Sequence, residues 1–165
     1  MTGEPEDLPG VTFVPVTEAM AEQLGAFLDD LRTAGDEATF HPHPLTRDEA
    51  RQIAHRAGLD VYLVGVERDR VVTYGMLRGW DEGFAVPSLG VAVHPAHRGR
   101  GLGRRMMGEL HTIARARGAT RVRLTLDVDH SAAKTLYASL GYRFEGSADG
   151  RLVGWLSLEG TQAGT

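Results

Sequence analysis

Residues 91–105, with the sequence VAVHPAHRGRGLGRR, join an apolar β-branched segment to a helix through a turn that contains three glycines. Glycine lets the backbone approach a ligand closely, and the free amides at a helix N-terminus favour negative charge. Arginines stand at positions 98, 100, 104 and 105, on either side of these amides. The stretch therefore predicts a site that holds a diphosphate.

Two common nucleotide-binding motifs do not fit these glycines. A P-loop requires a Lys-Ser/Thr pair after its second glycine, and no such pair follows here. A dinucleotide fingerprint requires a third glycine where this chain has Arg104, and about twenty residues later an acidic residue where it has Ala119. Both motifs are therefore excluded.

The composition limits the class of protein. A chain of 165 residues with 42% apolar and 24% charged residues is typical of one globular domain. The net charge of −4 argues against a nucleic-acid partner, and no apolar run is long enough for a signal peptide or membrane span. We expect a cytoplasmic protein with one domain at residues 10–159 and flexible tails at 1–9 and 160–165.

The periodicity of apolar residues predicts a mixed α/β fold in the order β-α-α-β-β-β-α-β-α-β-β. Pro15 places the first strand at a sheet edge, and Thr46 with Glu49 forms a capping box before the second helix. The predicted strands are 11–16, 60–67, 71–78, 84–93, 121–127, 142–146 and 152–158, and the predicted helices are 18–32, 47–58, 102–118 and 131–140.

Two segments together identify a resemblance. Arg98 to Gly103 fit the pattern Arg/Gln-x-x-Gly-x-Gly/Ala after a strand, and His130 to Tyr142 fit Asn-x-x-Ala-x-x-Leu-Tyr-x-x-x-Gly-Phe/Tyr, with histidine in place of asparagine. In both segments the chain resembles the GNAT superfamily of acyl-CoA-dependent N-acyltransferases. The resemblance extends over about residues 11–158 and implies a GNAT-type sheet flanked by helices, with acetyl-CoA as co-substrate.

The resemblance also implies which residues hold the cofactor. The glycine turn would clasp the pyrophosphate, and the strand before it would bind the pantetheine arm. The amide of Val91, or that of Ala92, would face the thioester oxygen. Among the arginines we expect Arg98 and Arg104 to meet phosphate, and Arg100 and Arg105 to be solvated or to touch the adenosine end. The full predicted set is Val91, Ala92, Val93, Arg98, Gly99, Arg100, Gly101, Leu102, Gly103, Arg104, His130 and Lys134.

For catalysis, Tyr137 matches the tyrosine that donates a proton to the departing thiolate in this family. Helical periodicity alone would equally make it a packing residue beside Leu136 and Leu140. Ser88 stands where many relatives carry a glutamate base, and serine can act there only by ordering a water. The other candidate bases are carboxylates that could also be simply solvated: Asp81, Glu82, Asp127 and Asp129.

The segment between the first two helices borders the acceptor site in this family, so we expect Phe40, His41 and His43 to contact the acceptor. A metal site is not expected, because the chain has no cysteine and no third ligand at a suitable spacing. His94 and His97 flank the cofactor turn, where they meet either phosphate or solvent. The acidic residues before this segment suit a cationic amine or a solvated helix end: Asp29, Asp30, Asp36 and Glu37.

These features predict an N-acetyltransferase that moves the acetyl group of acetyl-CoA to a primary amine of a small molecule or peptide. The lack of cysteine removes the common route through an acyl-enzyme thioester and favours direct transfer in a ternary complex. The rival hypothesis is a non-catalytic acyl-CoA-binding regulatory module. The sequence identifies neither the acceptor nor the oligomeric state, and a homodimer is compatible with the resemblance.

Overall fold

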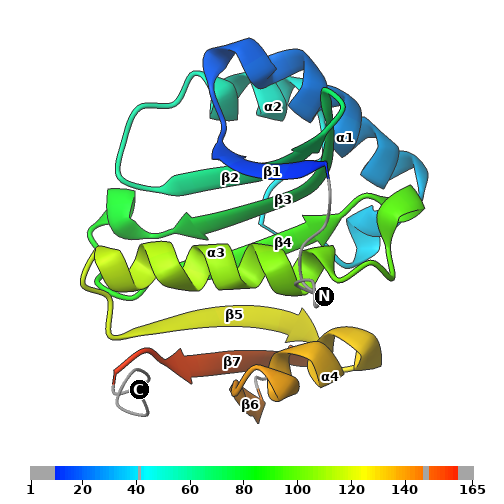
Figure 1. Cartoon of the computed structure of the whole chain (residues 1–165). Helices are drawn as coiled ribbons and strands as arrows, with labels where there is room; N and C mark the ends of the chain where they lie inside the picture. The colour runs from blue at the N-terminus through cyan, green and yellow to red at the C-terminus, as the bar shows by residue number, and fades with distance from the viewer. Residues whose placement is uncertain (1–9, 41, 147–148, 160–165) are drawn as a thin grey trace, which may run out of the picture.

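The computed structural model describes residues 10–40, 42–146 and 149–159, so the predicted tails at 1–9 and 160–165 lie outside the described residues. A twisted sheet runs through the molecule, with helices on both of its faces (Figure 1). No helix in the described part of the chain is long and apolar enough to cross a membrane.

The sheet has seven strands in the order β1-β2-β3-β4-β5-β7-β6. Neighbouring strands are antiparallel except β4 and β5, which are parallel because helix α3 connects them across one face of the sheet. The strands are β1 (Val11–Pro15), β2 (Val61–Glu67), β3 (Arg70–Arg78), β4 (Ser88–Val93), β5 (Arg121–Asp127), β6 (Arg143–Gly146) and β7 (Arg151–Ser157).

The protein has two apolar cores, one on each face of the sheet, and each core is covered by two helices. Helices α1 (Ala21–Thr33) and α2 (Arg47–Ala54) pack on one face of the sheet, around residues such as Tyr74 and Met76. Helices α3 (Leu102–Ala116) and α4 (Ser131–Ser139) pack on the other face, on residues such as Leu77 and Leu124. The predicted mixed α/β fold, its element order and the edge position of β1 are thus confirmed.

Some predicted element boundaries were wrong. The first helix begins with a 3₁₀ turn at Glu18–Met20, and its α-helical part starts only at Ala21. The Thr46 hydroxyl caps α2 by accepting from the Glu49 amide at 3.0 Å, as predicted, but α2 ends at Ala54 rather than near Gly58. The strand expected from residue 84 begins at Ser88, because Gly83 has a positive φ and Pro87 has no N–H to donate.

The β4–β5 junction positions the functional site. Only one ladder pair joins these strands, Ser88 with Arg123, supported by a 3.1 Å hydrogen bond from the Arg123 amide to the Pro87 carbonyl. Toward Val93 and Asp127 no further pair is recorded among the described residues, so the strands separate toward their C-terminal ends. The middle of the sheet therefore contains an opening between β4 and β5.

Candidate active site

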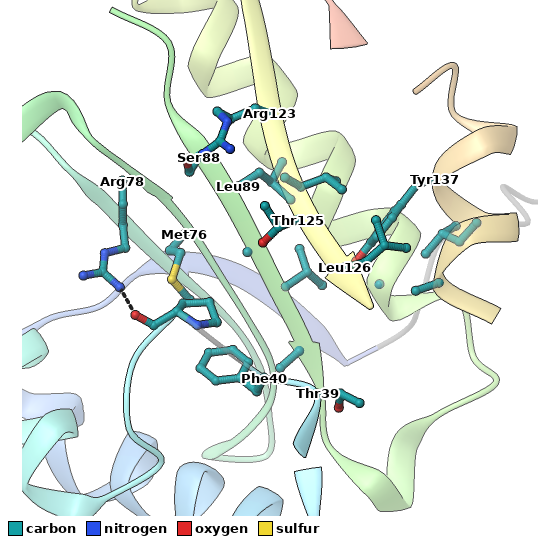
Figure 2. Close-up of a pocket in the computed structure, with 18 of the residues that line it drawn as sticks. Thr39, Phe40, Met76, Arg78, Ser88, Leu89, Arg123, Thr125, Leu126 and Tyr137 are labelled. Carbon is teal, nitrogen blue, oxygen red and sulfur yellow. Dashed lines mark hydrogen bonds between the residues drawn. The ribbon is translucent and has the colours of Figure 1, made fainter. Parts of the chain in front are cut away.

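A cavity of about 1170 Å³ occupies the opening between β4 and β5. It is lined by both strands, by the glycine turn before α3, by α4, and by the segment between α1 and α2. Figure 2 shows Tyr137 on α4 at one side of this opening, and Met76 and Arg78 of β3 at the other. Most of the residues predicted from sequence to form the site therefore meet in one place.

Backbone alternation decides which β4 amides face the cavity. The His94 amide donates to the Val72 carbonyl at 2.9 Å, and Ala92 lies opposite Tyr74 in the same ladder. Because hydrogen-bonding direction alternates along an antiparallel strand, the Ala92 amide points to β3, whereas those of Val91 and Val93 point into the opening. Of the two amides predicted to face the thioester oxygen, the geometry thus favours Val91.

The glycine turn has the form expected of an anion site. Gly99 and Gly101 have φ values of 82° and 80°, in the left-handed region, and a Cβ at either position would meet no other atom within 4 Å. Gly101 is the N-cap of α3, and the first backbone bond of this helix is donated by Arg105. The amides of residues 102–104 therefore remain available to a ligand, so this turn fits a diphosphate.

The arginines of this region divide into two groups. Arg98 and Arg104 line the cavity; Arg98 is paired with Asp36 at 2.5 Å, and Arg104 donates to the Ser139 hydroxyl at 2.7 Å. The Arg100 guanidinium instead lies away from the cavity, because it binds the Glu67 carboxylate at 3.1 and 3.3 Å. This pairing lowers the pKa of Glu67.

Lys134 and Arg105 also lie outside the cavity lining. Lys134 is exposed on α4 and is absent from the cavity lining. The Arg105 guanidinium lies over the Phe13 ring at 5.0 Å, and Arg105 is also absent from the cavity lining. Of the predicted cofactor-binding side chains, Arg98, Arg104 and His130 thus line the cavity, whereas Arg100 and Lys134 do not.

His130 has a local structural role that explains the departure from asparagine. Its Nδ1 accepts a hydrogen bond from the Ala133 amide at 3.4 Å and so caps the N-terminus of α4. Asparagine commonly fills the same capping position, since its side-chain oxygen accepts from the same kind of amide. The substitution therefore preserves the start of the helix that carries Tyr137.

Tyr137 faces the cavity from α4, and burial raises the pKa of its hydroxyl. Its ring contacts that of Tyr142 at 5.9 Å, and the Tyr142 hydroxyl bonds His111 Nε2 at 2.7 Å. Within the described part of the chain no hydrogen-bond partner is recorded for the Tyr137 hydroxyl. Tyr137 is thus packed in place and still has a proton to donate.

Four of the five candidate bases are hydrogen-bonded, paired with an arginine or outside the cavity. The Ser88 hydroxyl accepts from Arg123 at 3.1 Å. Asp81 accepts from the Leu59 amide at 2.6 Å, and this bond holds the pKa of its carboxyl below the usual value. Asp127 lies 3.9 Å from Arg151, and Asp129 is absent from the cavity lining. Glu82 lines the cavity on an exposed turn.

On the acceptor side, only part of the prediction agrees with the structure. Phe40 lines the cavity, and His41 lies outside the described residues. His43 is buried instead: its Nδ1 donates to the Pro44 carbonyl at 2.7 Å, and its Nε2 accepts from the Tyr74 hydroxyl at 2.8 Å. Burial also lowers the pKa of His43, and this histidine packs in the core and is absent from the cavity lining.

The other histidines and acids of this region bind one another. His94 Nε2 donates to Asp30 at 2.8 Å, and His97 lies 3.5 Å from Glu67. Asp29 pairs with Arg32, and Asp36 with Arg98, so the acids that suited a cationic amine are largely neutralised. Within residues 10–40, 42–146 and 149–159 no group of three potential metal ligands occurs.

Sequence reasoning missed several polar and aromatic side chains of the cavity wall, among them Arg78, Arg123, Thr125 and Trp155. Arg123 and Thr125 alternate with Val122, Leu124 and Leu126 on β5, and the latter three are buried against α3 and α4. The alternation of β5 was visible in the sequence. The polar face of this alternating strand is the sequence signal that could have located Arg123 and Thr125.

Residues 26–142, more than half of the chain, match the model of the Acetyltransferase (GNAT) family. An acetyltransferase of Sodalis glossinidius is 30% identical over 88 residues, which are 53% of this chain and 61% of that protein. An uncharacterised Mycobacterium leprae protein is 44% identical over 52 residues, 32% of this chain and 14% of that protein. The chain thus spans less than two thirds of the length of either curated relative.

Solved structures share the fold. The GNAT domain of S. lividans PAT superposes with a TM-score of 0.77 at 17% identity, covering 89% of this chain and 90% of that one. The PaiA N-acetyltransferase of Thermoplasma acidophilum, solved with coenzyme A, gives 0.75 at 11% identity, covering 89% and 98%. The family match, the shared fold and the open β4–β5 junction lead to one conclusion: this chain belongs to the GNAT family of acetyltransferases.

Proposed function

We propose that this protein transfers the acetyl group of acetyl-CoA directly to a primary amine of a small molecule or peptide. The observation that carries the proposal is the β4–β5 opening, which has the Val91 amide on one wall and the Tyr137 hydroxyl on the other. A proton donor and an amide donor across one cavity are what thioester aminolysis requires.

The cofactor would be held by groups that already point into the cavity. The amides of residues 102–104 and the guanidinium groups of Arg98 and Arg104 suit a diphosphate. The outward amides of Val91 and Val93 suit the amide groups of a pantetheine arm. Acetyl-CoA would supply the activated thioester, and coenzyme A is present in the T. acidophilum relative.

Each wall of the opening has a separate chemical role. The Val91 amide would donate to the oxygen on which negative charge develops, an interaction of the oxyanion-hole type that contributes roughly 10²–10³ in rate. The Tyr137 hydroxyl would donate its proton to the leaving sulfur. Burial raises the pKa of Tyr137, so it stays protonated at neutral pH and keeps that proton available.

The amine would have to enter as the neutral form. Among the described carboxylates of the cavity, Asp36, Asp60 and Asp127 are engaged by other groups, and Glu82 lies on an exposed turn. Ser88 is hydrogen-bonded to Arg123 and could act at most by ordering a water. We therefore expect kcat/KM to rise with pH as the free amine deprotonates. Direct attack also agrees with the absence of cysteine, because a route through an acyl-enzyme thioester needs a cysteine nucleophile.

The test is thiol release from acetyl-CoA with a panel of amines, followed by mass spectrometry of the products. The proposal predicts one N-acetylated product per thiol released. A protein that binds acetyl-CoA by calorimetry and releases no thiol with any amine would instead be an acyl-CoA-binding module, the rival function.

A further inference from the structure

The acceptor end of the cavity carries a row of hydrogen-bond donors. Arg78 on β3 pairs with Ser88 on β4, and Ser88 pairs with Arg123 on β5. Residues opposite one another on neighbouring strands project from the same face of a sheet, so the three side chains form one row. All three line the cavity, and Figure 2 shows them along its wall.

Both guanidinium groups of this row are held in place by neutral partners. Arg78 donates to the Pro42 carbonyl at 2.6 Å, and Arg123 donates to the Ser88 hydroxyl at 3.1 Å. The Arg123 guanidinium also lies 5.6 Å from the Trp155 ring centre. Each contact fixes the side chain while leaving its charge uncompensated and several N–H donors unused.

No carboxylate among the described residues pairs with either arginine. Three cavity acids are engaged elsewhere. Asp36 binds Arg98, Asp60 accepts from the amides of Gly79 and Asp81 at 3.0 and 3.1 Å, and Asp127 lies 3.9 Å from Arg151. Glu82 lies on an exposed turn. The Ser88 hydroxyl, which accepts from Arg123, keeps its own hydrogen for donation. The row thus consists of two cations and one hydroxyl donor, and no carboxylate of the described residues neutralises the two cations.

We propose that this row binds a carboxylate carried by the acceptor, so that the acceptor is an amino acid or a similar carboxylate-bearing amine. Adjacent strands are about 4.8 Å apart, which places the Arg78 and Arg123 Cα atoms about 10 Å apart with Ser88 between them. A carboxylate has about four acceptor positions, enough for both guanidinium groups and the hydroxyl.

The position of the row agrees with this assignment. Ser88 precedes Val91 by three residues on β4, so the row lies about 10 Å along the strand from the amide proposed to meet the thioester. An amine whose carboxylate is held at the row would have its nitrogen directed toward that amide. We therefore expect the protein to select acceptors by the distance between their amine nitrogen and their carboxylate.

This inference rests on the proposed acetyl transfer, and the experiment separates the two. Thiol release is measured for L-amino acids, ω-amino acids and dipeptides, each beside its carboxamide, and beside polyamines without an acidic group. We expect the best acids to exceed their carboxamides by at least about tenfold in kcat/KM, since charge-assisted hydrogen bonds are lost in the amide.

Variants of Arg78 and Arg123 test whether the preference for the acid over its carboxamide comes from this row. Arg78→Gln and Arg123→Gln are expected to lower kcat/KM for the acid by about 10- to 100-fold, mainly through KM, and for the carboxamide by less than about threefold. Arg143→Gln, an exposed arginine on β6 outside the cavity, is the matched control and should change neither value.

Carboxamides or polyamines accepted as well as the acids by the wild-type protein would overturn the carboxylate assignment and leave acetyl transfer intact. Equal losses for acid and carboxamide in both arginine variants would overturn it as well. Absence of thiol release with every amine would instead refute the proposed function itself.

Discussion

Gly101 offers the sharpest test of the anion site. It is the N-cap of α3 with a φ of 80°, and a Cβ added there would meet no atom within 4 Å. Gly101→Ala therefore causes no clash, and its cost is the left-handed backbone, about 1–2 kcal/mol. For a domain of this size we expect Tm to fall by roughly 2–4 °C for each kcal/mol.

Gly118 is a matched control at the other end of the same helix. It has a φ of 87°, equally open surroundings, and no place in the cavity lining. Gly118→Ala should thus lower Tm as much as Gly101→Ala. Only the change at Gly101 places a methyl group where a diphosphate would approach, so only this variant should lose affinity for coenzyme A, by about tenfold.

A charge at Gly101 should have a larger effect. One carboxylate about 5 Å from a phosphate charge, at an effective dielectric constant of about 20, costs about 3 kcal/mol, which corresponds to more than 100-fold in affinity. Calorimetric titration of coenzyme A into Gly101→Ala, Gly101→Glu and Gly118→Ala measures all three effects. Unchanged affinity in Gly101→Glu, or equal losses in both alanine variants, would refute the placement of the diphosphate.

Tyr137, Arg104 and the buried His111 carry the other predictions. Tyr137→Phe should lower kcat by about 10²–10⁴ while the Kd of coenzyme A stays constant; an unchanged kcat would exclude Tyr137 as the acid. Arg104→Met should weaken coenzyme A by several-fold and Arg100→Met by less than about twofold in calorimetry, because Arg100 binds Glu67 outside the cavity; the reverse order would contradict the assignment. Burial lowers the pKa of His111 to about 4 from 6.5, so the unfolded chain binds its proton first as pH falls. The free energy of unfolding should therefore drop by about 3 kcal/mol between about pH 6.5 and 4. Denaturant titrations should show less of this loss in His111→Gln, but an unchanged loss in the control His55→Gln, whose histidine is exposed.

The fold was predictable because its signals are local. The alternation of Val122, Leu124 and Leu126, the amphipathic pattern from Leu102, and the Thr46 cap each depend on a few neighbouring residues, and the structure confirms them. The start of β4 was misplaced because apolar residues before Pro87 continue the pattern of a strand although they form no ladder pair.

The site was harder to predict, since tertiary contacts decide which side chains are free. Arg100 and Arg98 are two residues apart in one motif, but Glu67 of β2 draws Arg100 away from the cavity. His43 was expected at the acceptor, and its bond to Tyr74 places it in the core. Arg78 was not singled out, because only the sheet register brings it level with Ser88.

The central claim is that the opening between β4 and β5 places a thioester between the Val91 amide and the Tyr137 hydroxyl. A crystal structure of the protein with coenzyme A tests this most directly. The account predicts the diphosphate on the amides of residues 102–104 and the sulfur within hydrogen-bond distance, roughly 3.5 Å, of the Tyr137 hydroxyl. A coenzyme A molecule bound outside the opening, or a sulfur directed away from Tyr137, would contradict it.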